Sequence, residues 1–171
     1  MFYPCLNNLK KAKFPKQSID LLDWWLGTRR QNTIKNINPL QFSLDCNINI
    51  EHTLKLFSYC TFSPDISLFK RKYVIYCPVC DHRIITYYAG TEKCSEYRCQ
   101  NCSTVVTESI LPRQTELLFE LTMSPQCLDD MYEEDRVVVG ASSKKANGLR
   151  VVDIQEHSNE EIRRLNIFDV L

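Results

Sequence analysis

A chain of 171 residues that is 44% hydrophobic and 25% charged can bury one ordinary core or two small ones, which excludes wholesale disorder. No apolar run approaches the roughly 18 residues of a membrane span, and the first residues lack a signal-peptide layout, so we expect a soluble cytoplasmic protein. Residues 1–76 carry eleven Lys and Arg against five acids, whereas residues 77–171 carry ten against sixteen. This polarity suggests different partners at the two ends, and it permits nucleic-acid binding without demanding it.

The first 17 residues are predicted to form a basic arm, because two prolines interrupt them and their four lysines show no apolar periodicity. These lysines fit a solvated face as well as they fit phosphate contacts. A helix is expected to open at Ser18, a good N-cap, and to end near Gly27. Of the adjacent Trp24 and Trp25, one can enter the core while the other lies at its margin or against a partner.

Two further helices are predicted from their N-caps. Asn38 followed by a proline is typical of a helix start, and Asn49 caps a helix that continues to Tyr59. Apolar side chains form a stripe along one side of this third helix. The polar residues left on or near its open side are His52, Lys55, Ser58 and Tyr59.

Residues 68–76 are rich in aromatic and β-branched residues and are predicted to form a strand. Two short helices joined by a tight turn after a longer helix give a helix-turn-helix layout, in which this strand would be the wing. The wing carries three consecutive basic residues, Lys70, Arg71 and Lys72.

The most specific motif is a pair of C-x-x-C sequences with the cysteines Cys77, Cys80, Cys99 and Cys102. Four thiolates at this spacing are the tetrahedral ligand set of a structural Zn²⁺, so we predict a zinc ribbon with one ion. A strand over 83–88, a turn and a returning strand at 97–98 fit the gap between the pairs. A closed four-cysteine site has no open position for a substrate, so the metal is expected to hold shape.

Alternatives to this ligand set are free cysteines, disulfides, or substitution by the nearby His82 and Cys94, and all rank below the four paired cysteines. Nine cysteines, an odd number, suit a reducing compartment, and we expect no structural disulfide. Zinc-ribbon knuckles often carry glycine after the second ligand. Here Asp81 and Ser103 stand there and would have to tolerate a left-handed backbone.

Beyond the ribbon, which spans 77–107, a short helix is predicted over 112–121 within a segment of helix and acidic linker, residues 108–135. The remaining residues, 136–171, are predicted to form a hairpin of strands 136–140 and 149–154 and then a terminal helix opened by a capping box. This appendage is too small to bury a core alone. We therefore expect it to dock on a partner through Ile162, Leu165, Ile167 and Phe168.

Over residues 18–107 the chain resembles winged helix-turn-helix domains that pass directly into a zinc ribbon. The N-terminal half of the large subunit of general transcription factor E has that order, and several bacterial regulators and accessory proteins are similar. The two C-x-x-C pairs carry the motif-level part of this resemblance. It implies an α+β fold with a winged helix over 18–76, a ribbon over 77–107 and a C-terminal appendage. The resemblance implies engagement of duplex nucleic acid or of a protein, and no enzyme activity.

Catalysis is not expected, because the three histidines are spread out and the four glycines form no phosphate loop. We favour a non-enzymatic adaptor subunit of a multi-protein complex, such as a bacterial antiviral defence system, with a larger partner such as an ATPase or nuclease.

The alternative is a DNA-binding transcriptional regulator. The polar face of the third helix would then enter the major groove, and the three basic residues of the wing would hold phosphates. That helix contains no Arg, Asn or Gln between Ile50 and Tyr59 to read base edges, which weighs against this alternative.

Overall fold

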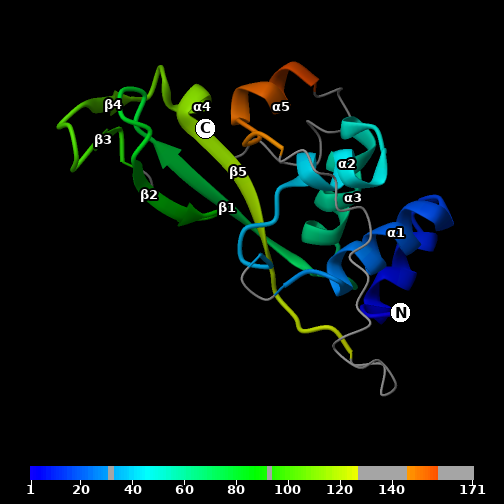
Figure 1. The fold of residues 1–171 in the computed structure, drawn as a ribbon. Helices are drawn as coiled ribbons and strands as arrows, with labels where there is room; N and C mark the ends of the chain where they lie inside the picture. The colour runs from blue at the N-terminus through cyan, green and yellow to red at the C-terminus, as the bar shows by residue number, and fades with distance from the viewer. Residues whose placement is uncertain (31–32, 92–93, 127–145, 158–171) are drawn as a thin grey trace. The chain divides into compact units, whose positions relative to one another are not determined.

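The computed structural model describes residues 1–30, 33–91, 94–126 and 146–157 and has a mixed α+β architecture (Figure 1). The chain forms two compact units. The first comprises residues 1–70 and 119–147, and the second comprises residues 71–118 and 148–171. No helix within the described ranges is long and apolar enough to cross a membrane.

The helices of the first unit are η1 (Pro4–Lys10, a 3-10 helix), α1 (Lys16–Gly27), α2 (Pro39–Cys46) and α3 (Ile50–Phe62), and residues 69–70 and 119–121 add the ends of two strands. The two predicted asparagine caps are confirmed. The side chain of Asn38 accepts a hydrogen bond from the backbone N–H of Leu40, and that of Asn49 accepts from Glu51. Each cap satisfies a donor that the first helical turn leaves unpaired.

The first 17 residues were expected to form a basic arm, and residues Pro4–Lys10 depart from this. They form η1, in which Leu6 and Leu9 are fully buried against α1 and α3. The buried carboxylate of Asp23 accepts hydrogen bonds from the backbone N–H groups of Phe2 and Tyr3, at 2.9 and 2.7 Å. Burial of apolar side chains from distant elements overrides a local pattern that looks solvated.

Helix α1 begins at Lys16 and not at Ser18, which lies within the helix and is buried. The Ser18 hydroxyl therefore caps no helix and lies 3.0 Å from Nε2 of His52 on α3. At the other end the prediction is confirmed, because α1 ends at Gly27. The two tryptophans also separate as expected, with Trp25 buried and Trp24 exposed.

Aromatic rings form the centre of the first unit. Phe57 stacks on Phe69 at 4.9 Å between ring centroids and meets Phe119 edge-on at 5.2 Å. Trp25 contacts Phe42 edge-on at 5.2 Å, and Phe42 contacts Phe57 in turn. Such pairs add about 0.5–1.5 kcal/mol each beyond the area that they bury, so this chain of rings fixes α1, α2 and α3 against one another.

Two sheets follow, and their strands are β1 (Phe69–Tyr76), β2 (Arg83–Tyr88), β3 (Glu96–Arg98), β4 (Val105–Thr107) and β5 (Thr115–Leu121). The order of the larger sheet is β2-β1-β5, and β3 pairs with β4 alone. The strand predicted over residues 68–76 is confirmed as β1, and it pairs antiparallel with β2. The returning strand β3 was expected beside β2, but it pairs with β4, so each cysteine pair lies in a hairpin of its own (Figure 1).

The helix predicted over 112–121 is wrong, since only the short α4 (Leu111–Gln114) is helical and β5 follows it. The buried residues Thr115, Leu117, Phe119 and Leu121 alternate, as in a strand. Leu118 stands between them and supplies helical spacing as well, so the local pattern satisfies both periods. Pairing with β1 decides between them.

The strand predicted over 149–154 is also wrong, because α5 (Val151–His157) occupies most of it. The carboxylate of Asp153 accepts a hydrogen bond from the backbone N–H of Arg150 at 3.0 Å, which is the reciprocal bond of a helix N-terminus. The partner strand expected at 136–140 and the terminal helix, with its docking residues Ile162, Leu165, Ile167 and Phe168, lie outside the described residues.

We predict that Gly27→Ala lowers the free energy of unfolding by about 1–3 kcal/mol, the usual cost of overpacking. A Cβ at this position would lie 2.2 Å from the ring of Phe2, which also packs edge-on against Trp24. Chemical denaturation measures the loss. In a Phe2→Ala background the same substitution should cost almost nothing. An equal loss of stability in both backgrounds would show that a clash with the Phe2 ring is not the cause.

Candidate metal centre

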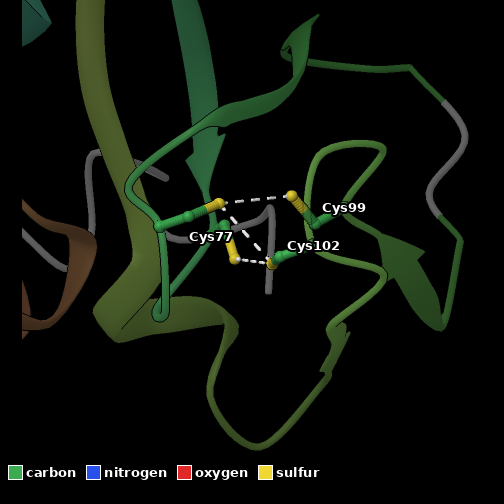
Figure 2. Close-up of side chains that lie close together, drawn as sticks. Cys77, Cys99 and Cys102 are labelled. Carbon is green, nitrogen blue, oxygen red and sulfur yellow. Dashed lines mark hydrogen bonds between the residues drawn. The ribbon is translucent and has the colours of Figure 1, made fainter.

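The four cysteines of the two C-x-x-C pairs converge on one point, as predicted. All four Sγ atoms lie within 4.8 Å of one another. Sγ of Cys77 lies 3.4 Å from that of Cys102, and Sγ of Cys80 lies 3.6 Å from that of Cys99 and 3.5 Å from that of Cys102 (Figure 2). A tetrahedral Zn²⁺ with bonds of about 2.3 Å separates its sulfur ligands by about 3.8 Å. The cluster therefore has the size of a zinc site.

The first cysteine pair lies in a tight turn between β1 and β2. The backbone N–H of Cys77 donates to the carbonyl of His82 at 2.9 Å, and the N–H of Asp81 donates to the carbonyl of Cys77 at 3.0 Å. The N–H of Val79 also points at Sγ of Cys77, at 3.5 Å. The turn thus presents a thiolate and stabilises its charge with a backbone donor.

The second pair repeats this geometry between β3 and β4. The N–H of Cys99 donates to the carbonyl of Thr104 at 2.8 Å, and the N–H of Ser103 donates to the carbonyl of Cys99 at 2.9 Å. Asp81 and Ser103, the residues after each second ligand, both have a left-handed backbone, with φ of 53° and 60°. The two knuckles are therefore equivalent, and neither uses the glycine that this conformation favours.

Hydrogen bonds prepare two of the thiols for metal binding. The Asn101 side chain and the backbone N–H of His82 lower the pKa of Cys80. The Thr104 hydroxyl, 3.1 Å from Sγ of Cys102, lowers the pKa of that thiol in the same way. Donors aimed at sulfur favour the thiolate, which is the form that binds zinc.

Crowding acts in the opposite direction on Cys99. The backbone N–H of Cys102 lowers the pKa of Cys99, but desolvation and the hydrogen bonds with Cys80 and Cys102 outweigh it and raise that pKa to about 11. Four thiolates within this space repel one another. A divalent cation removes the conflict, since a coordinating thiol is deprotonated outright. The donor set therefore fits a metal ion, and the soft sulfur ligands favour zinc.

Neither candidate substitute belongs to the cluster. His82 is exposed and contributes its backbone carbonyl to the first knuckle, while Cys94 is exposed and its N–H donates to the Tyr97 hydroxyl at 3.2 Å. The cysteines of the described part of the chain are all free of disulfides. The ligand set is thus the four paired cysteines.

The apolar core beside the metal centre is small. It consists of Ile75, Tyr97, Val106 and Leu111, with Ile84, Tyr87 and Ile110 packed against it. The buried residues come from β1, β3, β4 and α4, so the hairpin that carries the second cysteine pair packs on the strand that leads to the first.

The four polar residues predicted to lie on the open side of α3 do not form one exposed surface. Ser58 is 1% exposed, and its hydroxyl donates to the backbone carbonyl of Leu54 at 2.7 Å, so its prediction as a groove-facing residue is wrong. The rings of His52 and Tyr59 lie 5.8 and 5.6 Å from that of Phe14, which precedes α1. Lys55, the remaining member, is half-buried.

The basic residues predicted for the wing also differ in exposure. Lys70 is exposed and Arg71 half-buried, whereas Lys72 is only 7% exposed, which contradicts its prediction as a phosphate contact. The physical reason is that β1 is the central strand, with β2 on one side and β5 on the other. Side chains on both faces of a central strand are easily covered.

Sequence reasoning missed one surface feature, a hollow of about 620 Å³ along α1. Its described lining residues are Lys16, Gln17, Asp20, Leu21 and Trp24. Trp24 is 44% exposed. The spacing of three and four residues that joins this set was visible in the sequence, and the pair of tryptophans was the signal that one ring would face outward.

No protein-family model, no curated protein and no solved structure matches this chain. The centre itself defines the class: this is a small zinc-binding protein whose four cysteines are arranged to hold one metal ion between two hairpins.

We predict that the chain binds one equivalent of zinc and that Cys102→Ser lowers its affinity for zinc by more than about 100-fold, because loss of a direct ligand exceeds the loss of an outer-shell partner. Competition with a chromogenic chelator measures the affinity. Cys94→Ser is the matched control and should bind zinc as the parent does. Equal weakening by both substitutions would contradict the ligand set.

Proposed function

We propose that this protein is a non-enzymatic adaptor, in which structural zinc orders the β-rich unit and the helical unit, as a winged-helix scaffold, contacts a larger protein partner. The observation that carries this proposal is the exposed apolar hollow on α1. The larger partner is of the kind found in bacterial defence complexes, such as an ATPase or nuclease. The residues of α3 that were predicted to enter a DNA groove do not form one exposed surface. We therefore rank docking on a protein above recognition of a DNA sequence.

The hollow on α1 has the composition of a protein-binding surface. Trp24 and Leu21 supply its apolar part, and Lys16 and Asp20 border them with opposite charges. Tryptophan is enriched among the residues that dominate binding energy at interfaces, where it is surrounded by polar groups that exclude water. Phe2 supports the Trp24 ring edge-on at 5.5 Å, so the ring is held in place before a partner arrives.

A non-catalytic role is supported by what the described side chains do. The closed set of four thiolates leaves no coordination position for a substrate. Ser18 and His52 are 3.0 Å apart, as in a nucleophile and base, but Ser18 is buried and no carboxylate among the described residues hydrogen-bonds to His52. Desolvation, followed by the charge of Lys55, lowers the pKa of His52. A neutral imidazole bonded to a buried hydroxyl packs α1 against α3.

Affinity purification from the native host, with nuclease added to half of each sample, tests the adaptor role. A stoichiometric partner should survive nuclease, and Trp24→Ala should reduce its capture by about 30-fold, the effect of losing an interface hot spot worth about 2 kcal/mol. Leu44→Ala is the matched control, since Leu44 is an equally exposed apolar residue on α2. If nuclease treatment by itself releases every captured protein, the proposal is overturned.

A second candidate, binding of duplex DNA, is supported by a different observation. Lys10, Lys11, Lys13 and Lys16 are all exposed along the segment from η1 to the start of α1. Side chains of this kind hold phosphates without reading sequence.

If the chain binds duplex DNA, we expect Lys11→Glu, Lys13→Glu and Lys16→Glu together to weaken binding uniformly across sequences. The slope of log affinity against log salt should fall by about one for each phosphate that these lysines neutralise in the parent chain. Fluorescence anisotropy over a salt series measures both quantities. An unchanged slope would show that these lysines hold no phosphate.

A further inference from the structure

The two edges of the larger sheet differ in whether other described residues pair with their backbone. The outer edge of β5 is covered by other parts of the chain: Phe119 exchanges two backbone hydrogen bonds of 2.8 Å with Ile37, and the N–H of Leu117 donates to the carbonyl of Leu149 at 2.9 Å. The opposite edge is β2, the last strand in the order β2-β1-β5 (Figure 1). Among the described residues, no strand or bridge pairs with its outer side.

The register of β1 and β2 identifies the backbone groups on this open edge. The N–H of Ala89 donates to the carbonyl of Arg71, so hydrogen-bonded pairs alternate from there along the hairpin. Thr86 lies opposite Val74 in the register. Counted from Ala89, this is a non-hydrogen-bonded pair, so the N–H and C=O of Thr86 point away from β1.

The edge of β2 lacks the features that normally protect a strand from pairing. The segment from Ile84 to Tyr88 contains no charge and no proline, and all its residues are β-branched or aromatic. The single charge of β2 is Arg83, at one end, beside the irregularity in the register. Ile85 is 40% exposed. An exposed apolar side chain on a free edge strand promotes association with another strand.

We propose that the outer edge of β2 pairs antiparallel with β2 of a second copy of this chain. The strand is complementary to itself in this orientation. Antiparallel pairing places the two Arg83 side chains at opposite ends of the ladder, whereas parallel pairing would bring these like charges together. A twofold-symmetric contact of this kind is closed, so it gives a dimer and not a fibre.

Strand geometry also restricts the register. Outward-pointing groups must meet outward-pointing groups, so Thr86 can pair with Ile84 or Thr86 of the second copy, and in each case its N–H donates across the interface. The carbonyl of Tyr88 already accepts a hydrogen bond from the backbone N–H of Thr91 at 3.2 Å. A single short strand buries less than the area of a standard interface, so the dimer is weak and depends on concentration. This contact is separate from the hollow on α1.

Sedimentation velocity of the zinc-loaded full chain over a concentration series tests the proposal. The mass should rise from 20.0 kDa toward twice that value. Thr86→Pro should abolish the rise, because it removes a donor that the hairpin itself does not use. Thr86→Val keeps the donor and should associate as the parent does. The zinc content of each variant verifies that its hairpins are folded.

Ile85→Lys provides a second variant with an unchanged backbone, and it should also remain monomeric because it places two charges near the symmetry axis. A parent chain that stays monomeric up to its solubility limit would overturn the proposal. So would association that survives both Thr86→Pro and Ile85→Lys. Neither result bears on the adaptor role, because partner capture through Trp24 is measured independently.

Discussion

The arrangement of the two cysteine-bearing hairpins depends on the bonds between one metal ion and four sulfur atoms. The apolar cluster beside the metal centre contains four buried side chains, each worth about 1.5–3 kcal/mol before the entropy of ordering the chain is subtracted. A structural zinc site contributes about 10–16 kcal/mol at neutral pH. The two knuckles, held by matching backbone hydrogen bonds, bring the thiolates of separate hairpins within 4.8 Å of one another. Metal binding is therefore coupled to the ordering of these two hairpins.

Strand β1 contributes residues to the aromatic core and to the apolar cluster beside the metal centre. Its first residue, Phe69, stacks on Phe57 in the aromatic core of the first unit, and Ile75 near its end belongs to the core beside the metal. Cys77, the first ligand, follows directly after the strand. β1 is also the central strand of its sheet, which explains why Lys72 is buried in a stretch whose sequence looks exposed and basic. One strand thus takes part in both cores and in the metal centre.

Features with a local cause could be predicted from the sequence, and features that depend on distant burial could not. The ligand set follows from the spacing of Cys77 and its partners, and the starts of two helices follow from Asn38 and Asn49. The sequence left open the backbone at Asp81 and Ser103, where knuckles often carry glycine, and both residues are left-handed. Pairing of β3 with β4, burial of η1 and the strand character of β5 are non-local. In β5, one leucine makes the helical and strand periods indistinguishable until β1 supplies a partner.

The contrast between local patterns and burial by distant residues also determines which side chains of the helical unit are exposed. A helical wheel places the polar residues of α3 on one side, but it cannot show that Phe14 covers part of that side or that Ser58 bonds to its own helix. On α1 the opposite happens, because Trp25 takes the place in the core and leaves Trp24 outside with Phe2 behind it. A large apolar ring that is exposed yet held rigidly loses little entropy when it is covered. For this reason the proposed adaptor role assigns partner binding to the outer face of α1 and not to the polar residues of α3.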